Sequence, residues 1–108
     1  CDNVMANPDP GNMFSTSTAE HEPEALDKLA GRVGYFHFKN CYLHAGQYSY
    51  SVKLADGHID LNRYVQKLVE LGYDDNVCVE YCGAGDPHAA AEEDIKYLRA
   101  CLSRACKG

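Results

Sequence analysis

Three side chains of the types that bind metal ions occupy similar positions relative to apolar stretches of the chain. Asp9 follows one apolar run, His37 stands at the end of a second, and Glu80 lies within a third. Aspartate, histidine and glutamate together form a mixed nitrogen and oxygen site that suits Mn²⁺, Co²⁺, Mg²⁺ or Zn²⁺. Taken singly, Asp9 is explained as a turn residue, His37 as a buried histidine and Glu80 as an edge residue. Their common position favours one shared site.

Side-chain alternation along the expected strands supports this interpretation. Successive residues of a strand point to opposite faces, so His37 shares a face with Tyr35, opposite Phe36 and Phe38. Glu80 lies within the apolar sequence VCVEYC, where burial of an unpaired carboxylate is costly. A metal ion or a hydrogen-bonded cation at Glu80 would remove that cost.

The elements that must position these residues alternate between strand and helix. We expect strands at 3–7, 32–38 and 76–83, and helices at 22–31, 61–71 and 89–106. Strands that alternate with helices predict βα units and a parallel sheet, and polar residues at the carboxyl ends of parallel strands commonly form sites. The segment 39–58 has no clean period and is expected to be a long loop.

The most clearly predicted helix begins after Asp60, a favourable N-cap residue, and ends at Gly72. Its apolar residues recur at helical spacing and form one face: Leu61, Tyr64, Val65, Leu68 and Val69. In the last helix, Ile95, Leu98 and Leu102 are expected to share the face that packs on the core.

Three βα units leave both edges of a parallel sheet exposed. The chain also begins at Cys1, directly before a strand, which suggests that sequence is missing upstream. We therefore expect residues 1–108 to be a single partial domain, the C-terminal three βα units of a (βα)8 TIM barrel, which has about 250 residues when complete. By itself, such a piece is expected to be marginally stable or to associate.

The composition excludes several functional classes. The formal net charge is −6, with 10 Lys and Arg against 16 Asp and Glu, which argues against a nucleic-acid partner. No apolar run approaches the length of about 20 residues that spans a bilayer. No basic start followed by an apolar stretch is visible, so a cytoplasmic location without membrane association is expected.

The cysteines are expected to be reduced thiols. Their number is even, which is compatible with disulfides, but their spacing is irregular: Cys1, Cys41, Cys78, Cys82, Cys101 and Cys106. A zinc site built from the last four is a weaker alternative, because the C-x₃-C and C-x₄-C spacings are looser than those of zinc knuckles.

Three segments carry a family resemblance. NPDPGN, GRVGYFHFKN and DGHIDLNRYVQKLVELGYDDNVCVEY resemble the C-terminal part of a sugar phosphate isomerase/epimerase of the xylose isomerase-like TIM-barrel superfamily. In that family the sixth strand ends in D-p-x-[NH], the seventh in H-x-K-[DN] and the eighth in v-x-E. The resemblance runs from about residue 2 to residue 100.

The resemblance implies a role for each matching residue. Asp9, His37 and Glu80 would be three of the four ligands of a divalent metal, and the fourth would be a glutamate on an earlier strand, outside this chain. Asn12 and Lys39 would lie beside the metal and contact the substrate. Glu80 would also move a proton between neighbouring sugar carbons through an enediolate. The expected partners are a small carbohydrate substrate and the remaining barrel segment or a partner chain, within an oligomer.

Other reactions on the same fold remain open at this point. Asn40 stands where the family commonly has aspartate, and Asp56 replaces a glutamate. These departures leave the substrate open, since some members are dehydratases, lyases or C-glycoside-cleaving subunits. An endonuclease-type phosphodiesterase is disfavoured by the acidic charge. A non-catalytic fragment that completes a barrel is the remaining alternative.

Overall fold

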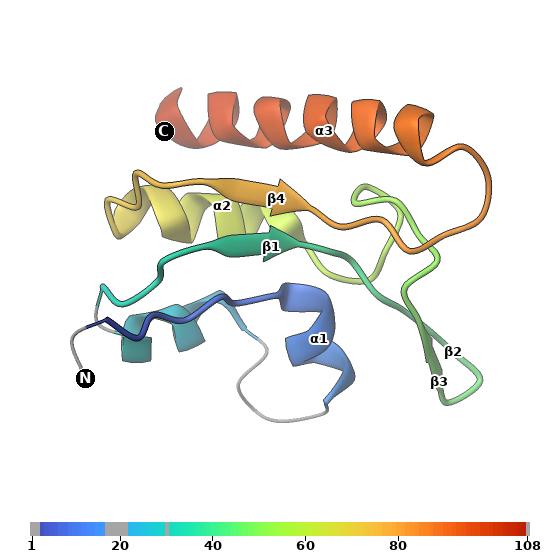
Figure 1. Cartoon of the computed structure of the whole chain (residues 1–108), viewed down its shortest axis with the longest axis horizontal. Helices are drawn as coiled ribbons and strands as arrows, with labels where there is room; N and C mark the ends of the chain where they lie inside the picture. The colour runs from blue at the N-terminus through green and yellow to red at the C-terminus, as the bar shows by residue number, and fades with distance from the viewer. Residues whose placement is uncertain (1–2, 17–21, 30, 108) are drawn as a thin grey trace.

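The computed structural model describes residues 3–16, 22–29 and 31–107 and shows an α/β arrangement (Figure 1). In chain order its elements are α1 (Pro10–Ser15), the 3₁₀ helix η1 (Pro23–Leu29), β1 (Phe36–Phe38), β2 (Tyr42–His44), β3 (Gln47–Ser49), α2 (Leu61–Glu70), β4 (Val77–Val79) and α3 (Pro87–Lys107). The strands β1 and β4 run in the same direction, and their carboxyl ends lie on the same side of the molecule as α1 and the β2–β3 hairpin (Figure 1). The described residues form no closed barrel.

The parallel sheet is centred on β1. His37 is the partner of Cys78 in the β1–β4 pairing. On the other side of β1, Ala6 forms a parallel bridge with Val33. Thus three segments lie in parallel, as the alternating pattern predicts. The strand predicted at 3–7 was too long, however, because this segment makes a single bridge, from Ala6 to Val33.

The core lies on the helix-covered face of the sheet. Phe36 and Phe38 are fully buried, whereas Tyr35 on the opposite face is exposed, so the predicted alternation is confirmed. The buried cluster comprises Leu26, Phe36, Phe38, Leu54, Leu61, Tyr64, Val65, Leu68 and Cys101. The helices α2 and α3 pack against one another on this side.

The helix α2 matches its prediction in its bounds and caps, but Val69 of the predicted apolar face is exposed. Asp60 accepts a hydrogen bond from the Asn62 N–H at 3.1 Å, as an N-cap does, and Gly72 has φ +70° just after the helix. The predicted face of α3 was wrong in part. Ile95 and Leu102 are exposed, and the residues that α3 buries include Asp94.

The segment 39–58 is not a loop throughout, because it contains the antiparallel hairpin of β2 and β3. Ala45 and Gly46 form its turn, and both have positive φ (50° and 76°). This is the geometry of the type I′ turn, which favours Asn-Gly and Asp-Gly sequences. The Ala-Gly pair lacks that signature, which is why the sequence pattern did not indicate a hairpin.

Asn40 holds the segment around the hairpin in place. Its side-chain Nδ2 donates to the carbonyl oxygens of Leu54 (2.8 Å) and Ile59 (3.0 Å). Its Oδ1 accepts from the N–H groups of Cys41 (2.7 Å) and Ile59 (3.0 Å). A Cβ atom at Gly57 would lie 2.1 Å from the Asn40 side chain, so only glycine permits this close approach.

Two short helices differ from the sequence predictions. In the segment predicted as a helix at 22–31, Pro23–Leu29 form η1, a 3₁₀ helix, and residue 30 lies outside the described part of the chain. The Pro-rich turn after Asp9 continues into α1, because Pro10 suits the first helical position and Asp9 accepts from the Asn12 N–H. This helix was not predicted.

Among the described residues, the five cysteines are free thiols, while Cys1 lies outside them. Cys78, Cys82, Cys101 and Cys106 do not gather into a group of metal ligands within the described ranges. No helix in the described part of the chain has the length and apolar character needed to cross a membrane.

Candidate metal centre

The backbone of the parallel sheet brings the three predicted ligands together at the carboxyl ends of its strands. The His37 N–H donates to the carbonyl oxygen of Pro8 at 3.0 Å, which places Asp9 beside β1. The Glu80 N–H donates to the carbonyl oxygen of Phe38 at 3.0 Å, which places Glu80 on the other side of β1. Segments far apart in the chain therefore meet at one edge of the sheet.

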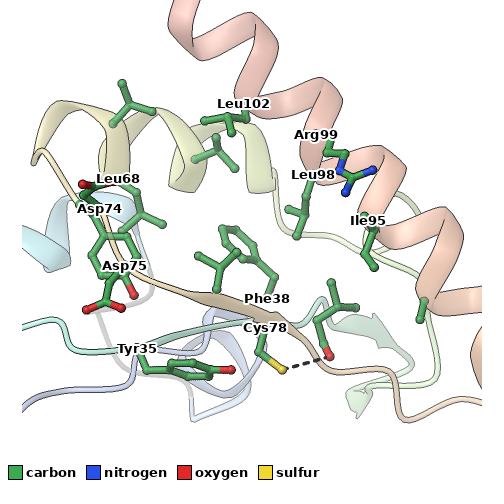
Figure 2. Close-up of a pocket in the computed structure, with 16 residues that line it drawn as sticks. Tyr35, Phe38, Leu68, Asp74, Asp75, Cys78, Ile95, Leu98, Arg99 and Leu102 are labelled. Carbon is green, nitrogen blue, oxygen red and sulfur yellow. Dashed lines mark hydrogen bonds between the residues drawn. The ribbon is translucent and has the colours of Figure 1, made fainter.

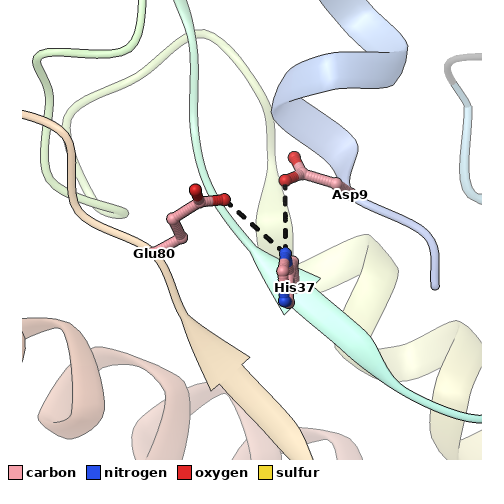
Figure 3. Close-up of side chains that lie close together, drawn as sticks. All are labelled: Asp9, His37 and Glu80. Atoms are coloured by element: carbon pink, nitrogen blue, oxygen red, sulfur yellow. Dashed lines mark ion pairs between the residues drawn. The ribbon is translucent and has the colours of Figure 1, made fainter.

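The side chains of these residues converge (Figure 3). His37 Nδ1 lies 3.9 Å from Asp9 Oδ2 and 3.6 Å from Glu80 Oε2. One ligand atom of each residue lies within 4.8 Å of the others, and no other such group of ligand residues occurs in the described ranges. The spacing allows all three to contact one ion after small side-chain movements.

The carboxylate of Asp9 is the most buried of the three ligand groups. Its Oδ1 accepts from the Asn12 N–H at 3.0 Å, which fixes the orientation of the group. Its Oδ2 is buried and has no hydrogen-bond partner among the described residues. Burial raises the pKa of Asp9, although the Asn12 hydrogen bond and the charge of Lys39 oppose this shift. A buried oxygen without a hydrogen bond suits a metal ligand.

The imidazole of His37 has a partner on each side. Nδ1 faces the two carboxylates, and Nε2 lies 3.4 Å from the side-chain amide of Asn7. Metal-bound histidines typically use their second ring nitrogen in a hydrogen bond that fixes the tautomer. Asn7 was not singled out in the sequence, because one asparagine near a turn carries no signal of such a role.

Lys39 contributes a cation to the same cluster. Its Nζ lies 3.3 Å from Glu80 Oε2 and 3.5 Å from Asp9 Oδ2, and its side chain is 8% exposed. Burial acts to lower the pKa of Lys39, but the adjacent carboxylates of Asp9 and Glu80 outweigh it and raise that pKa above its ordinary value. The ammonium group is therefore present at neutral pH and lies beside the candidate ligands.

The two remaining predicted roles are placed differently. Glu80 is 41% exposed at its side chain, so its carboxylate has access to solvent as well as to the cluster. Asn12 supports Asp9 through its backbone, and it is exposed. The structure thus joins Asp9, His37, Lys39 and Glu80 through their side chains, while Asn12 joins through its N–H group.

The arrangement fits a divalent metal ion. It offers two carboxylate oxygens and one imidazole nitrogen, which is a donor set used for Mn²⁺, Co²⁺, Mg²⁺ or Zn²⁺. Asp9 is buried, and the amide of Asn7 lies beside His37 Nε2. Contacts of this kind orient the ligands of a metal site.

Aromatic side chains of the hairpin region make ring contacts with Lys39, with α1 and with His58. Lys39 Nζ lies 4.6 Å from the ring centroid of Tyr50, which follows β3. Tyr48 makes an edge contact with Phe14 of α1 at 5.7 Å between centroids. Tyr42 stacks on His58 at 4.4 Å. Tyr50 thus contacts the charged cluster, while the other two ring pairs connect the hairpin to α1 and to His58.

A large apolar groove lies away from this cluster (Figure 2). It has a volume of about 740 Å³ and is formed by β4, α2 and α3. Its exposed apolar residues include Val77 (45% exposed), Ile95 (41%) and Leu102 (48%). None of the three candidate ligands lines it. All three residues of β4 line the groove, and among the described strands β4 pairs with β1 alone.

Comparison with known proteins identifies the family and the fold of the chain. The family model of the xylose isomerase-like TIM barrel matches residues 1–101. The chain is similar to the solved structure of L-ribulose 3-epimerase, with a TM-score of 0.81 and 21% sequence identity. It is also similar to a xylose isomerase-like TIM barrel protein from Mycobacterium smegmatis in complex with magnesium (0.74, 26%) and to a xylose isomerase domain protein from Planctomyces limnophilus (0.67, 23%).

These similarities cover almost all of this chain, from 96% to 99% of it, but only 36% to 39% of the matched chains. The chain therefore spans less than two fifths of the length of these structures. No curated protein matches it. The shared fold is a parallel α/β part of a TIM barrel.

Proposed function

The chain belongs to the xylose isomerase-like TIM barrel family, and from this premise we propose that it forms the metal-binding part of an isomerase or epimerase that acts on a small carbohydrate. The single observation that carries the proposal is the convergence of Asp9, His37 and Glu80 at the carboxyl ends of parallel strands. Active sites of TIM barrels lie at that end.

Each residue of the cluster then has a chemical task. Asp9, His37 and Glu80 would hold the ion, which when bound supplies positive charge opposite the oxygens where negative charge develops. Glu80, the more exposed carboxylate, accepts the proton of the sugar carbon next to the carbonyl group, which leaves an enediolate. In an isomerisation this proton returns to the neighbouring carbon while a hydroxyl proton moves between the two oxygens, and in an epimerisation a second group protonates the opposite face of the same carbon. Lys39 donates a hydrogen bond to a substrate oxygen, and the exposed Asn12 side chain binds a hydroxyl group.

The rest of the barrel supplies what the described residues do not. We propose that a glutamate on an earlier strand provides the fourth ligand and the second proton-transfer group. It comes from further sequence of the same protein or from a partner chain. The share of the relatives that this chain covers, and the apolar groove beside β4, support this proposal.

Metal binding tests the proposal directly. Titration of the chain with Mn²⁺, followed by calorimetry, is expected to give one site per chain. The isosteric substitutions Asp9→Asn and Glu80→Gln, and His37→Asn, which removes the imidazole, should each weaken binding by at least about tenfold, because each removes one ligand from the site. In the completed barrel the same substitutions should abolish sugar isomerisation or epimerisation.

Glu92→Gln is the matched control. Glu92 is exposed on α3, so this substitution removes one negative charge outside the cluster. Its binding should equal that of the unchanged chain. If all three cluster variants retained both metal binding and activity, the proposed function would be wrong.

A further inference from the structure

Lys39 is in contact with two kinds of group at once. On one side its ammonium approaches the carboxylates of Asp9 and Glu80 at 3.5 and 3.3 Å. On another it lies over the ring of Tyr50, 4.6 Å from the centroid. A lysine ammonium within about 6 Å of an aromatic ring centroid is attracted by the ring face. Tyr50 therefore limits where this flexible side chain places its charge.

Tyr50 is itself held by the element that carries Asp9. Its hydroxyl forms a hydrogen bond with the Ser15 hydroxyl. Ser15 is the last residue of α1, whose N-cap is Asp9. The same short helix thus orients one candidate ligand at its first turn and the Tyr50 ring at its last residue, so Lys39 is positioned from both directions.

We propose that Tyr50 is a positioning residue, which fixes the Lys39 ammonium beside Asp9 and Glu80 and so links the β2–β3 hairpin to the candidate site. The importance of this role for catalysis rests on the proposed function, because Lys39 is the group that would bind a substrate oxygen. Tyr50 acts through Lys39 and has no task in the proton transfer itself.

The position of Lys39 can be read without metal or substrate. Protons above the face of an aromatic ring are shielded, so the side-chain methylene resonances of Lys39 next to its ammonium should lie upfield of those of exposed Lys107. Tyr50→Phe keeps the ring and should preserve most of this shift. Tyr50→Leu removes the ring and should abolish it. Ser15→Ala and Tyr50→Phe each remove the hydrogen bond between Ser15 and Tyr50 but keep the ring, so both should reduce the shift in part and to a similar extent.

Tyr48→Leu is the matched control. Tyr48 lies on the same hairpin, but its ring contacts Phe14 instead of Lys39. This variant should leave the Lys39 resonances unchanged. If the Lys39 shift is absent in the unchanged chain, or survives in Tyr50→Leu, the inference is wrong. If Tyr50→Leu does not fold, the variants Tyr50→Phe and Ser15→Ala test the role of Tyr50. Complete loss of the shift in Tyr50→Phe, or an unchanged shift in Ser15→Ala, would contradict that role.

Kinetics in the completed barrel provide a second measurement. Tyr50→Leu should lower kcat on the order of tenfold with a smaller change in KM, and Tyr50→Phe should stay within about twofold of the unchanged protein. Equal losses in both variants would show that the ring does not act through Lys39. Absence of metal-dependent activity in the unchanged protein would instead contradict the proposed function, while the resonance measurement would still test Tyr50.

Discussion

Asn40 illustrates how a single side chain controls the segment beside the candidate site. Its amide makes two donated and two accepted hydrogen bonds, and the residue is 1% exposed. An amide is required for this, since a carboxylate accepts hydrogen bonds but cannot donate to the carbonyl oxygens of Leu54 and Ile59. The hydrogen bonds around residue 40 therefore require an amide.

We therefore expect Asn40→Asp to destabilise the protein by about 3 kcal/mol, because it leaves buried carbonyl groups without donors. Urea unfolding followed by circular dichroism measures this change. Asn62→Asp is the control: Asn62 Oδ1 accepts from Arg104 at 2.6 Å, and aspartate accepts equally well. A change below about 0.5 kcal/mol is expected there. Equal stability of both variants would contradict the explanation.

Asn7 is expected to affect metal affinity although it is not a candidate ligand. Asn7→Leu removes the partner of His37 Nε2, so the ring loses the contact that orients Nδ1 toward the carboxylates. Affinity for Mn²⁺ should fall by about 10- to 100-fold. Asn76→Leu, at the other end of β4, should leave it unchanged. An unaltered affinity in Asn7→Leu would exclude this supporting role.

At the scale of elements, the buried carboxylate of Asp94 connects α3 to the segment that follows the hairpin. Asp94 Oδ1 accepts from the Leu54 N–H at 2.9 Å, and the neighbouring Lys53 and Glu93 form an ion pair at 2.7 Å. Asp94 Oδ2 is buried without a hydrogen-bond partner among the described residues. Burial raises the pKa of Asp94, although the Leu54 hydrogen bond opposes this.

This shift predicts a pH dependence of stability. Between the unfolded pKa of about 3.9 and the raised pKa of Asp94 in the folded state, the folded protein keeps a proton that the unfolded chain has released. The contribution of Asp94 to the free energy of unfolding therefore falls as the pH rises through this range. Urea unfolding at a series of pH values should show this decline relative to Asp94→Asn. A constant difference between the two proteins would contradict it.

The elements also show which parts of the fold were predictable from sequence. The helix α2 has a capping aspartate, a regular apolar face and a terminal glycine, and these local signals sufficed. The hairpin was missed because Ala45 adopts φ 50° in a turn that usually carries asparagine or aspartate. The predicted face of α3 was partly wrong, because the apolar residues Ile95 and Leu102 line the exposed groove and do not pack in the core.

For the site, the spacing of strand-end residues and the family resemblance predicted Asp9, His37, Lys39 and Glu80, which the sheet brings together. Two contacts of the site could not be predicted, because they depend on the folded positions of loop residues. They are the contact of the Asn7 amide with His37 and the contact of the Tyr50 ring with Lys39.

At the scale of the whole molecule, exposed apolar residues gather around β4 and α3. The groove of about 740 Å³ is rimmed by exposed aliphatic side chains. Contiguous exposed apolar surface rimmed by polar residues is typical of interaction sites. We expect a neighbouring strand and helix of the barrel to cover this groove in the complete protein.

The chain by itself should therefore associate as its concentration rises, which sedimentation velocity can measure. Ile95→Lys and Leu102→Lys, which place charge in the groove, should shift the distribution toward monomer. Leu43→Lys, a similar change on the exposed hairpin, should not. A monomer that unfolds sharply and independently of concentration would contradict this expectation, as would equal behaviour of all three variants.

The parallel ladder has a consequence for how the protein assembles. Asp9 reaches His37 through the pairing on one side of β1, and Glu80 reaches it through β4 on the other side. Both pairings join segments distant in sequence, and such contacts form late because closing long loops is slow. Ion binding at the candidate site would therefore require both pairings, so its rate during refolding would report when the second pairing forms. The bound ion would in turn stabilise both pairings.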